Sequence, residues 1–369
     1  MKEDLHIVHV SAHPGWRGGE QQLSYVLSEL SNFPCQRLLF CSRNHAMHSY
    51  AIQHKIPYKL FNSSPFLWLY SAWQLHRICR KKNVHIIHAH DAKAHTLVFL
   101  SFLLGNRTPS IISRRVDFPI QKNLFSKWKY NNNGIAKYIC VSDKVREVLI
   151  KDLADKSKAV TIHSGIDKNR FNPDLKSAIL RKQFNIPPFK FLAGNVASLA
   201  DHKDYFTFVD TAEHVLRQCK DIQFLIIGDG PLHQQVTRYI QSKGLEKDII
   251  LTGFRSDIDQ ILPELDVLLF TSKTEGLGTS ILDAMACGVP VVSTNAGGIP
   301  EIVSHGDNGL MASVGDSVTL ANHVLEIIRN VSLKENLIKA GFDTVNSFSK
   351  EEMSKKTYEM YLRIGNRKK

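Results

Sequence analysis

The stretch from Thr274 to Val292 decides the fold, and it reads Thr-Glu-Gly-Leu-Gly-Thr-Ser-Ile-Leu-Asp-Ala-Met-Ala-Cys-Gly-Val-Pro-Val-Val. It predicts a glycine-rich turn, a short helix and then a buried strand. Gly276 and Gly278 let the backbone turn sharply and approach a ligand closely. Thr279 or Ser280 is expected to cap the helix that follows.

A turn of this kind directs free N–H groups and the positive end of a helix at one point, which suits a phosphate group. Two carboxylates frame that point, Glu275 in the loop and Asp283 within the helix. An ionised carboxylate only accepts hydrogen bonds, so its natural partners on a phosphorylated ligand are hydroxyl groups. The stretch therefore predicts a nucleotide-sugar site.

Outward from this stretch, short apolar runs of strand length alternate with helical patterns along the whole chain. Such alternation is typical of parallel sheets covered by helices on both faces. We expect an α/β protein with two doubly wound domains, residues 1–175 and 185–349, and a C-terminal helix over about 350–369 is a candidate to pack back on the first. The expected strands are 5–10, 37–41, 84–88, 110–113, 137–141 and 160–162 in the first domain, and 189–196, 222–227, 249–252, 267–270 and 289–293 in the second.

Composition limits the classes of function. The 369 residues suffice for two cores, and apolar and charged contents of 43% and 22% are ordinary for a soluble protein. No run approaches the roughly 18 apolar residues that cross a bilayer. The first strand is too short for a secretory signal, so a cytoplasmic location is expected. The six cysteines are scattered, which favours core packing over metal or disulfide chemistry.

The net charge of +12 favours acidic partners such as nucleic acid, anionic lipid or phosphorylated substrates. An aromatic stretch, 66–73, leads into the basic run 77–82. This composition is typical of a helix at a membrane interface. It also fits an ordinary amphipathic helix whose basic end complements the helix dipole. Peripheral contact with an anionic membrane therefore remains open at this point.

Glu275 and Asp283, with the glycine loop between them, resemble the E-x7-E motif of the retaining glycosyltransferases of family 4. Further segments agree with this family: Gly18-Gly19-x-Gln, His163 to Asp167, Gly228 to Pro231, Gly253 to Arg255, and Gly297 to Val303. The resemblance implies a GT-B fold, in which two Rossmann-like domains face each other across a cleft. It also implies retaining transfer of a sugar from a nucleotide-diphosphate sugar, with a UDP-sugar favoured, and without a metal or other cofactor.

The resemblance assigns roles to residues of the second half. Glu275 would hold hydroxyls of the donor sugar, and Asp283 the two ribose hydroxyls. Lys203 would lie on the diphosphate, where an ammonium offsets the charge that builds on the leaving group. The backbone of the glycine loop would hold the same diphosphate, and other loops would add contacts to the nucleotide sugar: Gly276, Leu277, Gly278 and Thr279, then Gly228, Gly230, Phe254 and Arg255.

Two positions depart from the family pattern. Asp283 stands where the family has a second Glu, which shortens the reach to the ribose. Ser198 stands where an Arg usually accompanies the lysine, and a hydroxyl brings a hydrogen bond but no charge. Arg255, or a basic residue of the first domain, is a candidate to supply that charge, and weakened donor turnover is the alternative.

In the first half, the segment His88-Ala89-His90-Asp91 is similar to the family's H-x-H segment, whose histidine faces the donor sugar. We expect His90 in that role, because it lies further toward the loop and imidazole is a usable donor or acid near neutral pH. Gly18 and Gly19 would line the bottom of the cleft. A plain strand–helix turn is the competing interpretation for these two glycines.

The pair Asp257 and Asp259 matches a D-x-D metal motif, but helix-start carboxylates are the better interpretation, so no metal site is predicted. The predicted function is transfer of a sugar to a glycan or lipid-linked intermediate of envelope polysaccharide or lipopolysaccharide synthesis, at the inner face of the cell membrane. One rival is a GT-B nucleotide-sugar epimerase, which would need no acceptor. The other is a basic nucleic-acid-binding protein, disfavoured because most aromatics fall on periodic apolar positions.

Overall fold

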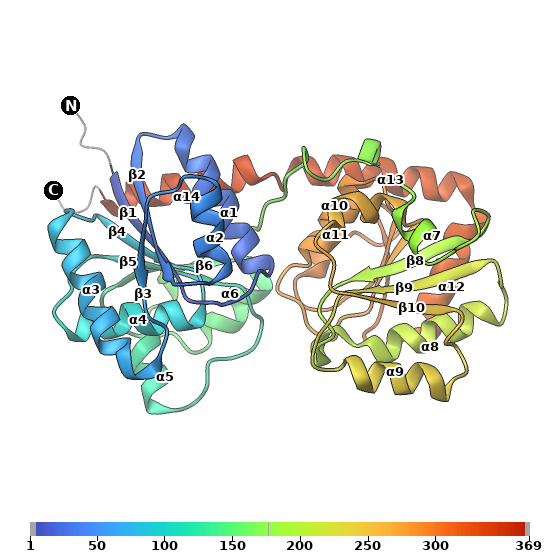
Figure 1. Ribbon diagram of the computed structural model, residues 1–369, viewed down its shortest axis with the longest axis horizontal. Helices are drawn as coiled ribbons and strands as arrows, with labels where there is room; N and C mark the ends of the chain where they lie inside the picture. The colour runs from blue at the N-terminus through green and yellow to red at the C-terminus, as the bar shows by residue number, and fades with distance from the viewer. Residues whose placement is uncertain (1–4, 176, 366–369) are drawn as a thin grey trace. The chain divides into compact units, whose positions relative to one another are not determined.

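The computed structural model describes residues 5–175 and 177–365, and it divides the chain into two compact units (Figure 1). The first unit contains the chain up to Gly165 together with the segment from Lys350 onward. The second runs from Ile166 to Ser349. The parts of the expected first domain and C-terminal helix at 1–4 and 366–369 lie outside the described residues.

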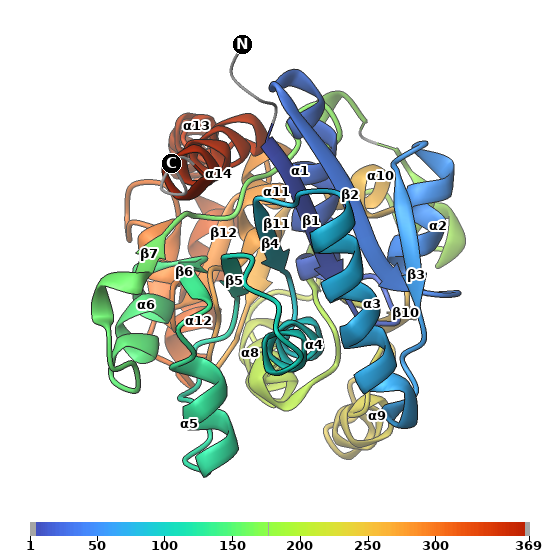
Figure 2. The same cartoon turned by 90° about the vertical axis from the view of Figure 1, so that its left-hand side faces the viewer.

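The first unit contains a parallel sheet of seven strands in the order β3-β2-β1-β4-β5-β6-β7. The helices α1 and α2 lie in connections that run along the sheet toward β3, whereas α3, α4 and α5 lie in connections that run toward β7. Because such connections are right-handed, the two groups of helices cover opposite faces of the sheet. Figure 2 shows the sheet with its covering helices. The elements are β1 Leu5–Ser11, α1 Gly18–Glu29, β2 Cys35–Ser42, α2 Ala46–Gln53, β3 Tyr58–Phe61, α3 Trp68–Lys81, β4 Ile86–Ala89, α4 Ala92–Leu103, β5 Ser110–Arg114, α5 Leu124–Tyr130, β6 Ile135–Cys140, α6 Asp143–Ile150 and β7 Ala159–Thr161.

The second unit contains a parallel sheet of six strands in the order β10-β9-β8-β11-β12-β13. Two of its inner strands, β9 and β11, are buried along their whole length, as expected for a sheet covered on both faces. The elements are α7 Ile179–Gln183, β8 Phe191–Val196, α8 Tyr205–Leu216, β9 Ile222–Ile227, α9 His233–Ser242, β10 Ile249–Gly253, α10 Ile258–Ile261, β11 Val267–Phe270, α11 Thr279–Ala286, β12 Val291–Thr294, β13 Leu310–Ala312, α12 Ser317–Arg329 and α13 Val331–Asn346. Two doubly wound α/β units are thereby confirmed.

The last helix, α14 (Lys350–Gly365), belongs to the first unit and packs beside α1 (Figure 1). Its apolar side chains share a core with β1 and β4, and Tyr361 is fully buried there. The phenol oxygen of Tyr361 lies 2.6 Å from Nδ1 of His88. The first unit is therefore built from both ends of the chain.

The structure divides the chain at 165–166, earlier than the expected boundary between 175 and 185, around which Pro173, Pro187 and Pro188 interrupt the sequence pattern. Residues 166–184 pack with the second unit rather than the first: the N–H of Ile166 donates to the carbonyl of Phe348 (2.9 Å), and the N–H of Leu180 donates to Glu264 (3.1 Å). Prolines interrupt a sequence pattern, but buried hydrogen bonds decide which unit a segment joins.

Two strands escaped the sequence analysis, β3 and β13. β3 is an edge strand whose first two residues are exposed, and β13 has only three residues, so neither shows a long apolar run. Among the described helices, none is both long and apolar enough to cross a bilayer.

Candidate functional site

The loop between β11 and α11 forms the centre of the candidate site in the second unit. Gly278 precedes the first residue of α11 with φ = 90°, a left-handed conformation that favours glycine. The expected cap by Thr279 or Ser280 was wrong, because Gly278 occupies the cap position and no side chain caps this helix. A helix start without a side-chain cap keeps its first N–H groups available to an anion.

The loop is held in place by its backbone. The carbonyl of Glu275 accepts a hydrogen bond from the N–H of Gly298 (2.9 Å), and Gly276 and Leu277 are buried. A side chain at Gly278 would contact Ile281 and Glu275, at 3.2 and 3.5 Å. The predicted diphosphate contacts at 276–279 therefore lie on a fixed turn at the carboxyl end of β11.

Lys203 and Glu275 form an ion pair between Nζ and Oε2, although 72 residues separate them in sequence. Both side chains are largely buried, and Ser272 Oγ also donates to the Glu275 carboxylate (3.4 Å). The backbone that carries Lys203 is tied to the same region, because Thr271 Oγ1 donates to its carbonyl (3.2 Å). The structure thus brings together the two residues with predicted roles on the diphosphate and on the sugar.

Asp283 lies on α11, and its burial raises the pKa of the carboxyl group from 3.8 to about 7, an effect that the positive charge of Arg170 partly opposes. Arg170 itself pairs with Asp259 (3.7 Å). Near neutral pH, a carboxyl group of this kind is partly protonated, so it can donate as well as accept a hydrogen bond. Both modes suit a pair of ribose hydroxyls.

The two glycines of the loop after β9 have a structural reason of their own, because this loop packs against the loop after β8. A Cβ at Gly228 would lie 2.1 Å from the carbonyl oxygen of Ala197, and one at Gly230 would lie 2.6 Å from that of Leu199. The N–H of Leu199 donates to the carbonyl of Asp229 (3.1 Å). These glycines allow two loops to touch backbone to backbone, while their predicted contact with the ligand stays a prediction.

Arg255 is engaged elsewhere than expected. Its guanidinium binds both carboxylate oxygens of Asp257, at 2.8 and 2.5 Å, and also reaches Gln183. Asp257 precedes α10, so the interpretation of this acidic pair as helix-start carboxylates is confirmed. Ser198 and Phe254 are exposed. To supply the charge that Ser198 lacks, Arg255 would have to leave these partners.

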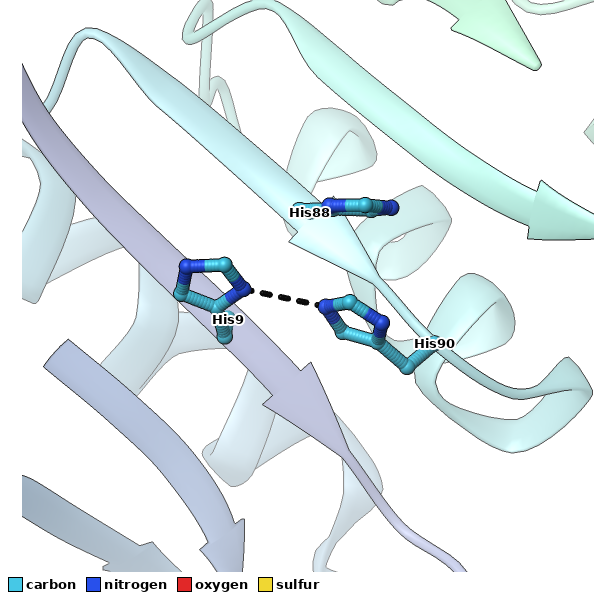
Figure 3. A group of neighbouring side chains, drawn as sticks. All are labelled: His9, His88 and His90. Atoms are coloured by element: carbon cyan, nitrogen blue, oxygen red, sulfur yellow. Dashed lines mark hydrogen bonds between the residues drawn. The ribbon is translucent and has the colours of Figure 1, made fainter. Parts of the chain in front are cut away.

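His90 lies directly after β4 and belongs to a cluster with His88 and His9 (Figure 3). Nδ1 of His9 and Nε2 of His90 are 3.0 Å apart, and the ring centroids of His88 and His90 are 4.0 Å apart. His9 was missed, although it is a polar residue inside an apolar strand run. It pairs in register with His88 across β1 and β4.

The histidine cluster is uncharged near neutral pH. All three rings are at most 5% exposed. Burial, followed by the proximity of positive groups, lowers the pKa of His9 to about 3 and those of His88 and His90 well below 6.5. The His90 imidazole is therefore a neutral hydrogen-bonding group, which fits the expected role of a donor rather than that of an acid, and its contact with the donor sugar stays a prediction.

One ring nitrogen from each histidine lies within 4.8 Å of the others, a spacing that a metal ion could bridge. His88, however, already has partners for both nitrogens, Tyr361 (2.6 Å) and Ser113 (2.9 Å). Arg115 also adds positive charge to the surroundings of His88 and His90. Binding an ion here would require His88 to give up a partner next to a cation.

Gly18 and Gly19 are the first two residues of α1 rather than a separate turn after β1. Arg17 is the N-cap residue before this helix, and its N–H donates to the Glu20 carboxylate (3.1 Å). A Cβ added at Gly19 would lie 3.6 Å from Cδ of Arg115. Their expected place at the bottom of a cleft stays a prediction.

Comparisons with known proteins agree with both halves of the chain. A sequence model described as glycosyltransferase family 4 matches residues 16–170, and one described as glycosyl transferases group 1 matches residues 176–344. The chain belongs to the family 4 glycosyltransferases.

Two relatives align with most of this family 4 glycosyltransferase. N-acetyl-alpha-D-glucosaminyl L-malate synthase of Bacillus anthracis is 25% identical over 313 residues, which cover 82% of this chain and 80% of the relative. A UDP-Gal:alpha-D-GlcNAc-diphosphoundecaprenol alpha-1,3-galactosyltransferase of Escherichia coli is 26% identical over 299 residues, which cover 75% and 76%.

Solved structures share the fold of this glycosyltransferase. HepE of Anabaena, in complex with UDP and glucose, superposes with a TM-score of 0.83 at 23% identity and covers 96% of this chain and 99% of its own. A glycosyltransferase of Rickettsia africae gives a TM-score of 0.84 at 20% identity, with 98% of each chain covered. The expected GT-B fold is confirmed.

Proposed function

We propose that this glycosyltransferase moves a sugar from a UDP-sugar to a glycan or lipid-linked acceptor, with retention and without a metal, in the synthesis of envelope polysaccharide or lipopolysaccharide. The observation that carries the proposal is the Lys203–Glu275 pair beside the uncapped start of α11. Together they offer an ammonium and backbone N–H groups to a diphosphate, and a carboxylate to sugar hydroxyls.

In the proposed reaction, one glycosidic bond breaks and another forms at the same carbon atom. The bond between the anomeric carbon and the diphosphate oxygen breaks, while the acceptor oxygen bonds to that carbon on the same face. The leaving phosphate takes the proton of the acceptor hydroxyl, so no separate protein base is required. Lys203 and the N–H groups at the start of α11 stabilise the charge that grows on the leaving group.

Several relatives support the donor and acceptor classes. The Escherichia coli relative uses UDP-Gal and a diphosphoundecaprenol-linked sugar. The Bacillus anthracis relative makes an α-linked N-acetylglucosaminyl product. An α product from an α-linked nucleotide sugar is the stereochemical outcome that retention predicts. These relatives are transferases, which disfavours the epimerase alternative.

A thermal-shift panel of uridine, guanosine and adenosine diphosphate sugars tests the donor class. A ligand that binds only the folded state stabilises it by RT ln(1 + [L]/Kd), so the matching donor raises Tm in proportion to its occupancy. We expect a uridine compound to give the largest rise. A larger rise with guanosine or adenosine compounds would overturn the choice of base.

Nuclear magnetic resonance of the product formed on a lipid-linked acceptor tests the mechanism. An α linkage from an α donor, formed equally well with and without EDTA, is the expected result. A β linkage, activity that EDTA abolishes, or a changed sugar without any acceptor would each contradict a stated part of the proposal.

We also propose that the protein works in the cytoplasm at the inner face of the membrane, where a lipid-linked acceptor presents its head group. Cell fractionation tests this location: the protein should divide between the cytosol and salt-releasable membrane fractions. Recovery in the periplasm would contradict it.

A further inference from the structure

The helix layer of the first unit that contains α3, α4 and α5 exposes an unusual amount of apolar surface. Phe66 is 96% exposed, Leu69 63% and Leu124 86%. Eleven of the twenty-one exposed large apolar residues in the described chain lie between residues 66 and 128, namely Phe66, Leu67, Leu69, Tyr70, Trp73, Leu103, Leu104, Phe118, Leu124, Phe125 and Trp128. We call these eleven residues the apolar patch.

The three helices that carry most of the apolar patch are neighbours. α3 packs against α4 (Figure 2). The ring of Phe99 on α4 lies 5.6 Å from that of Phe125 and 4.8 Å from that of Trp128, both on α5. The buried ring of Phe99 thus anchors α5, while Leu124 and much of Trp128 remain exposed. The three helices therefore form one layer, on which Leu69, Leu124 and Trp128 are exposed.

Positive charge is concentrated in the same part of the chain. Residues 31–142 contain sixteen Lys and Arg but only two acidic residues, Asp91 and Asp117. The difference, 16 − 2 = +14, exceeds the net charge of the whole chain, +12, so the remaining residues carry a net charge of −2. The Asp91 carboxylate is already occupied by the N–H groups of Ala12, Lys93 and Ala94.

Charge and apolar side chains alternate along the layer. Arg77 places its guanidinium 4.6 Å from the ring centroid of Trp73, and Tyr70 stacks on the same residue at 5.7 Å. The last turn of α3 carries the exposed Arg80 and Lys81. Exposed Lys122 and Lys127 flank the apolar residues of α5.

We propose that this layer is a docking surface for an anionic phospholipid bilayer. The inference deepens the proposed function, and rests on it insofar as a lipid-linked acceptor is presented at such a surface. Aromatic and aliphatic side chains beside Lys and Arg are the composition that enters the head-group region of a membrane. Apolar side chains gain free energy when they leave water, and basic side chains are attracted to an anionic surface.

The aliphatic residues favour a bilayer over nucleic acid. Exposed aromatics among basic residues can stack on bases, so Trp73, Tyr70 and Arg77 alone would fit either partner. Leu69, Leu124 and the exposed leucines at the end of α4 have no base-stacking role, but they lose contact with water in a lipid head-group region.

Co-sedimentation of the full chain with vesicles tests the docking surface. Vesicles of phosphatidylcholine alone are compared with vesicles that also contain phosphatidylglycerol. The apolar variant combines Phe66→Ser, Leu69→Ser and Leu124→Ser, and the charge variant combines Arg77→Gln, Arg80→Gln and Lys81→Gln. Because all six side chains are exposed, folding should survive, and circular dichroism checks that it does.

Matched controls come from exposed residues of the second unit. Phe189→Ser with Val331→Ser removes comparable apolar surface, and Lys220→Gln, Lys247→Gln and Lys339→Gln removes comparable charge. We expect the wild type to bind anionic vesicles, and each layer variant to bind them about tenfold or more weakly. The controls should bind as the wild type does.

Three results would overturn the proposal: no binding of the wild type to anionic vesicles, equal binding by the layer variants, or equal loss in the controls. Random-sequence duplex DNA is the competing probe. Binding to DNA that the charge variant abolishes, without binding to vesicles, would assign the surface to nucleic acid instead. Binding of the sugar donor, measured by thermal shift, should be unchanged in all variants. A failure of membrane docking can therefore be distinguished from a failure of the transferase proposal.

Discussion

The two units build their candidate functional groups in different ways at the carboxyl ends of parallel strands. In the second unit, the candidate site consists of the turn before the uncapped start of α11, with one ammonium and one carboxylate paired beside it. In the first unit, three imidazoles pack against one another and against Tyr361, and burial keeps them neutral. One unit supplies charge, and the other supplies uncharged hydrogen-bonding groups.

This difference has a physical cause. A charge can remain in a largely buried site if a partner compensates it, as Lys203 and Glu275 do for each other. A buried histidine needs no such partner, because it can lose its proton at little cost near neutral pH and become neutral. The following variants test whether charge in one unit and neutrality in the other are both required.

The largest expected effect comes from the charged pair. Lys203→Ala and Glu275→Ala should each reduce kcat about 100-fold or more, because one removes charge stabilisation from the leaving group and the other the hold on the sugar. Steady-state transfer assays measure this, with urea unfolding to check the fold. Lys243→Ala breaks a surface pair with Glu213 and is the matched control. Full activity in either site variant would mean that the assigned role is wrong.

The next effect concerns the backbone of the second unit. Gly228→Ala would place a Cβ 2.1 Å from a carbonyl oxygen, so we expect a loss of about 3 kcal/mol in the free energy of unfolding. Gly253→Ala is the matched control, since φ is also positive there (72°) but nothing lies within 4 Å of the added carbon. It should cost only about 1 kcal/mol. Urea titration measures the free energy of unfolding of both variants. Equal losses would show that the two loops are not in backbone contact at Gly228.

The histidine cluster should make the first unit sensitive to acid. His9 has a folded-state pKa of about 3 against 6.5 in the unfolded chain, so the unfolded state binds more protons between these values, and stability is lost as pH falls below about 6.5. At pH 5, this residue alone should cost about 2 kcal/mol relative to pH 7. His9→Gln should flatten that dependence in urea titrations at several pH values. An unchanged slope would show that His9 is not a buried neutral group.

The smallest expected effect has the opposite sign and belongs to the second unit. Asp283 has a folded-state pKa of about 7 against 3.8, so the folded state binds more protons in that interval, and stability is lost as pH rises through 7. Because the Asp283 side chain is only partly buried, solvent screens much of this effect, and Asp283→Asn should stabilise the protein at pH 8 by about 1–2 kcal/mol and change little at pH 4. The same variant should bind the donor more weakly. A destabilised variant at pH 8 would contradict the assignment of a costly buried carboxylate.

The sequence predicted the strands of both sheets well where they are long and apolar. Ile222–Ile227 and Val267–Phe270 agree residue for residue with the structure. The short β13 and the exposed edge strand β3 gave no such signal. The approach of Lys203 to Glu275 was predictable because both follow central strands of one sheet, whose carboxyl ends lie at the same edge.

Other parts of the site depend on tertiary contacts that no local pattern reports. The hydroxyl of Tyr361 reaches His88 from 273 positions further along the chain. The lowered pKa of His90 follows first from its burial and then from the neighbouring His88, His9 and Arg115, rather than from its motif. Gly278 takes the helix cap from Thr279 because the turn itself requires a left-handed residue there.

The return of α14 to the first unit has a consequence for biosynthesis. Leu5 and Ile86 share a core with Met353 and Tyr361, so the polypeptide made first stays partly unpacked until the last helix has left the ribosome. The intervening segment, from Ile166 to Ser349, has its own core and is free to fold earlier. Translation that stops before Lys350 should leave a folded second unit attached to an incompletely packed, aggregation-prone first unit. Chaperones would then bind the N-terminal part of that nascent chain.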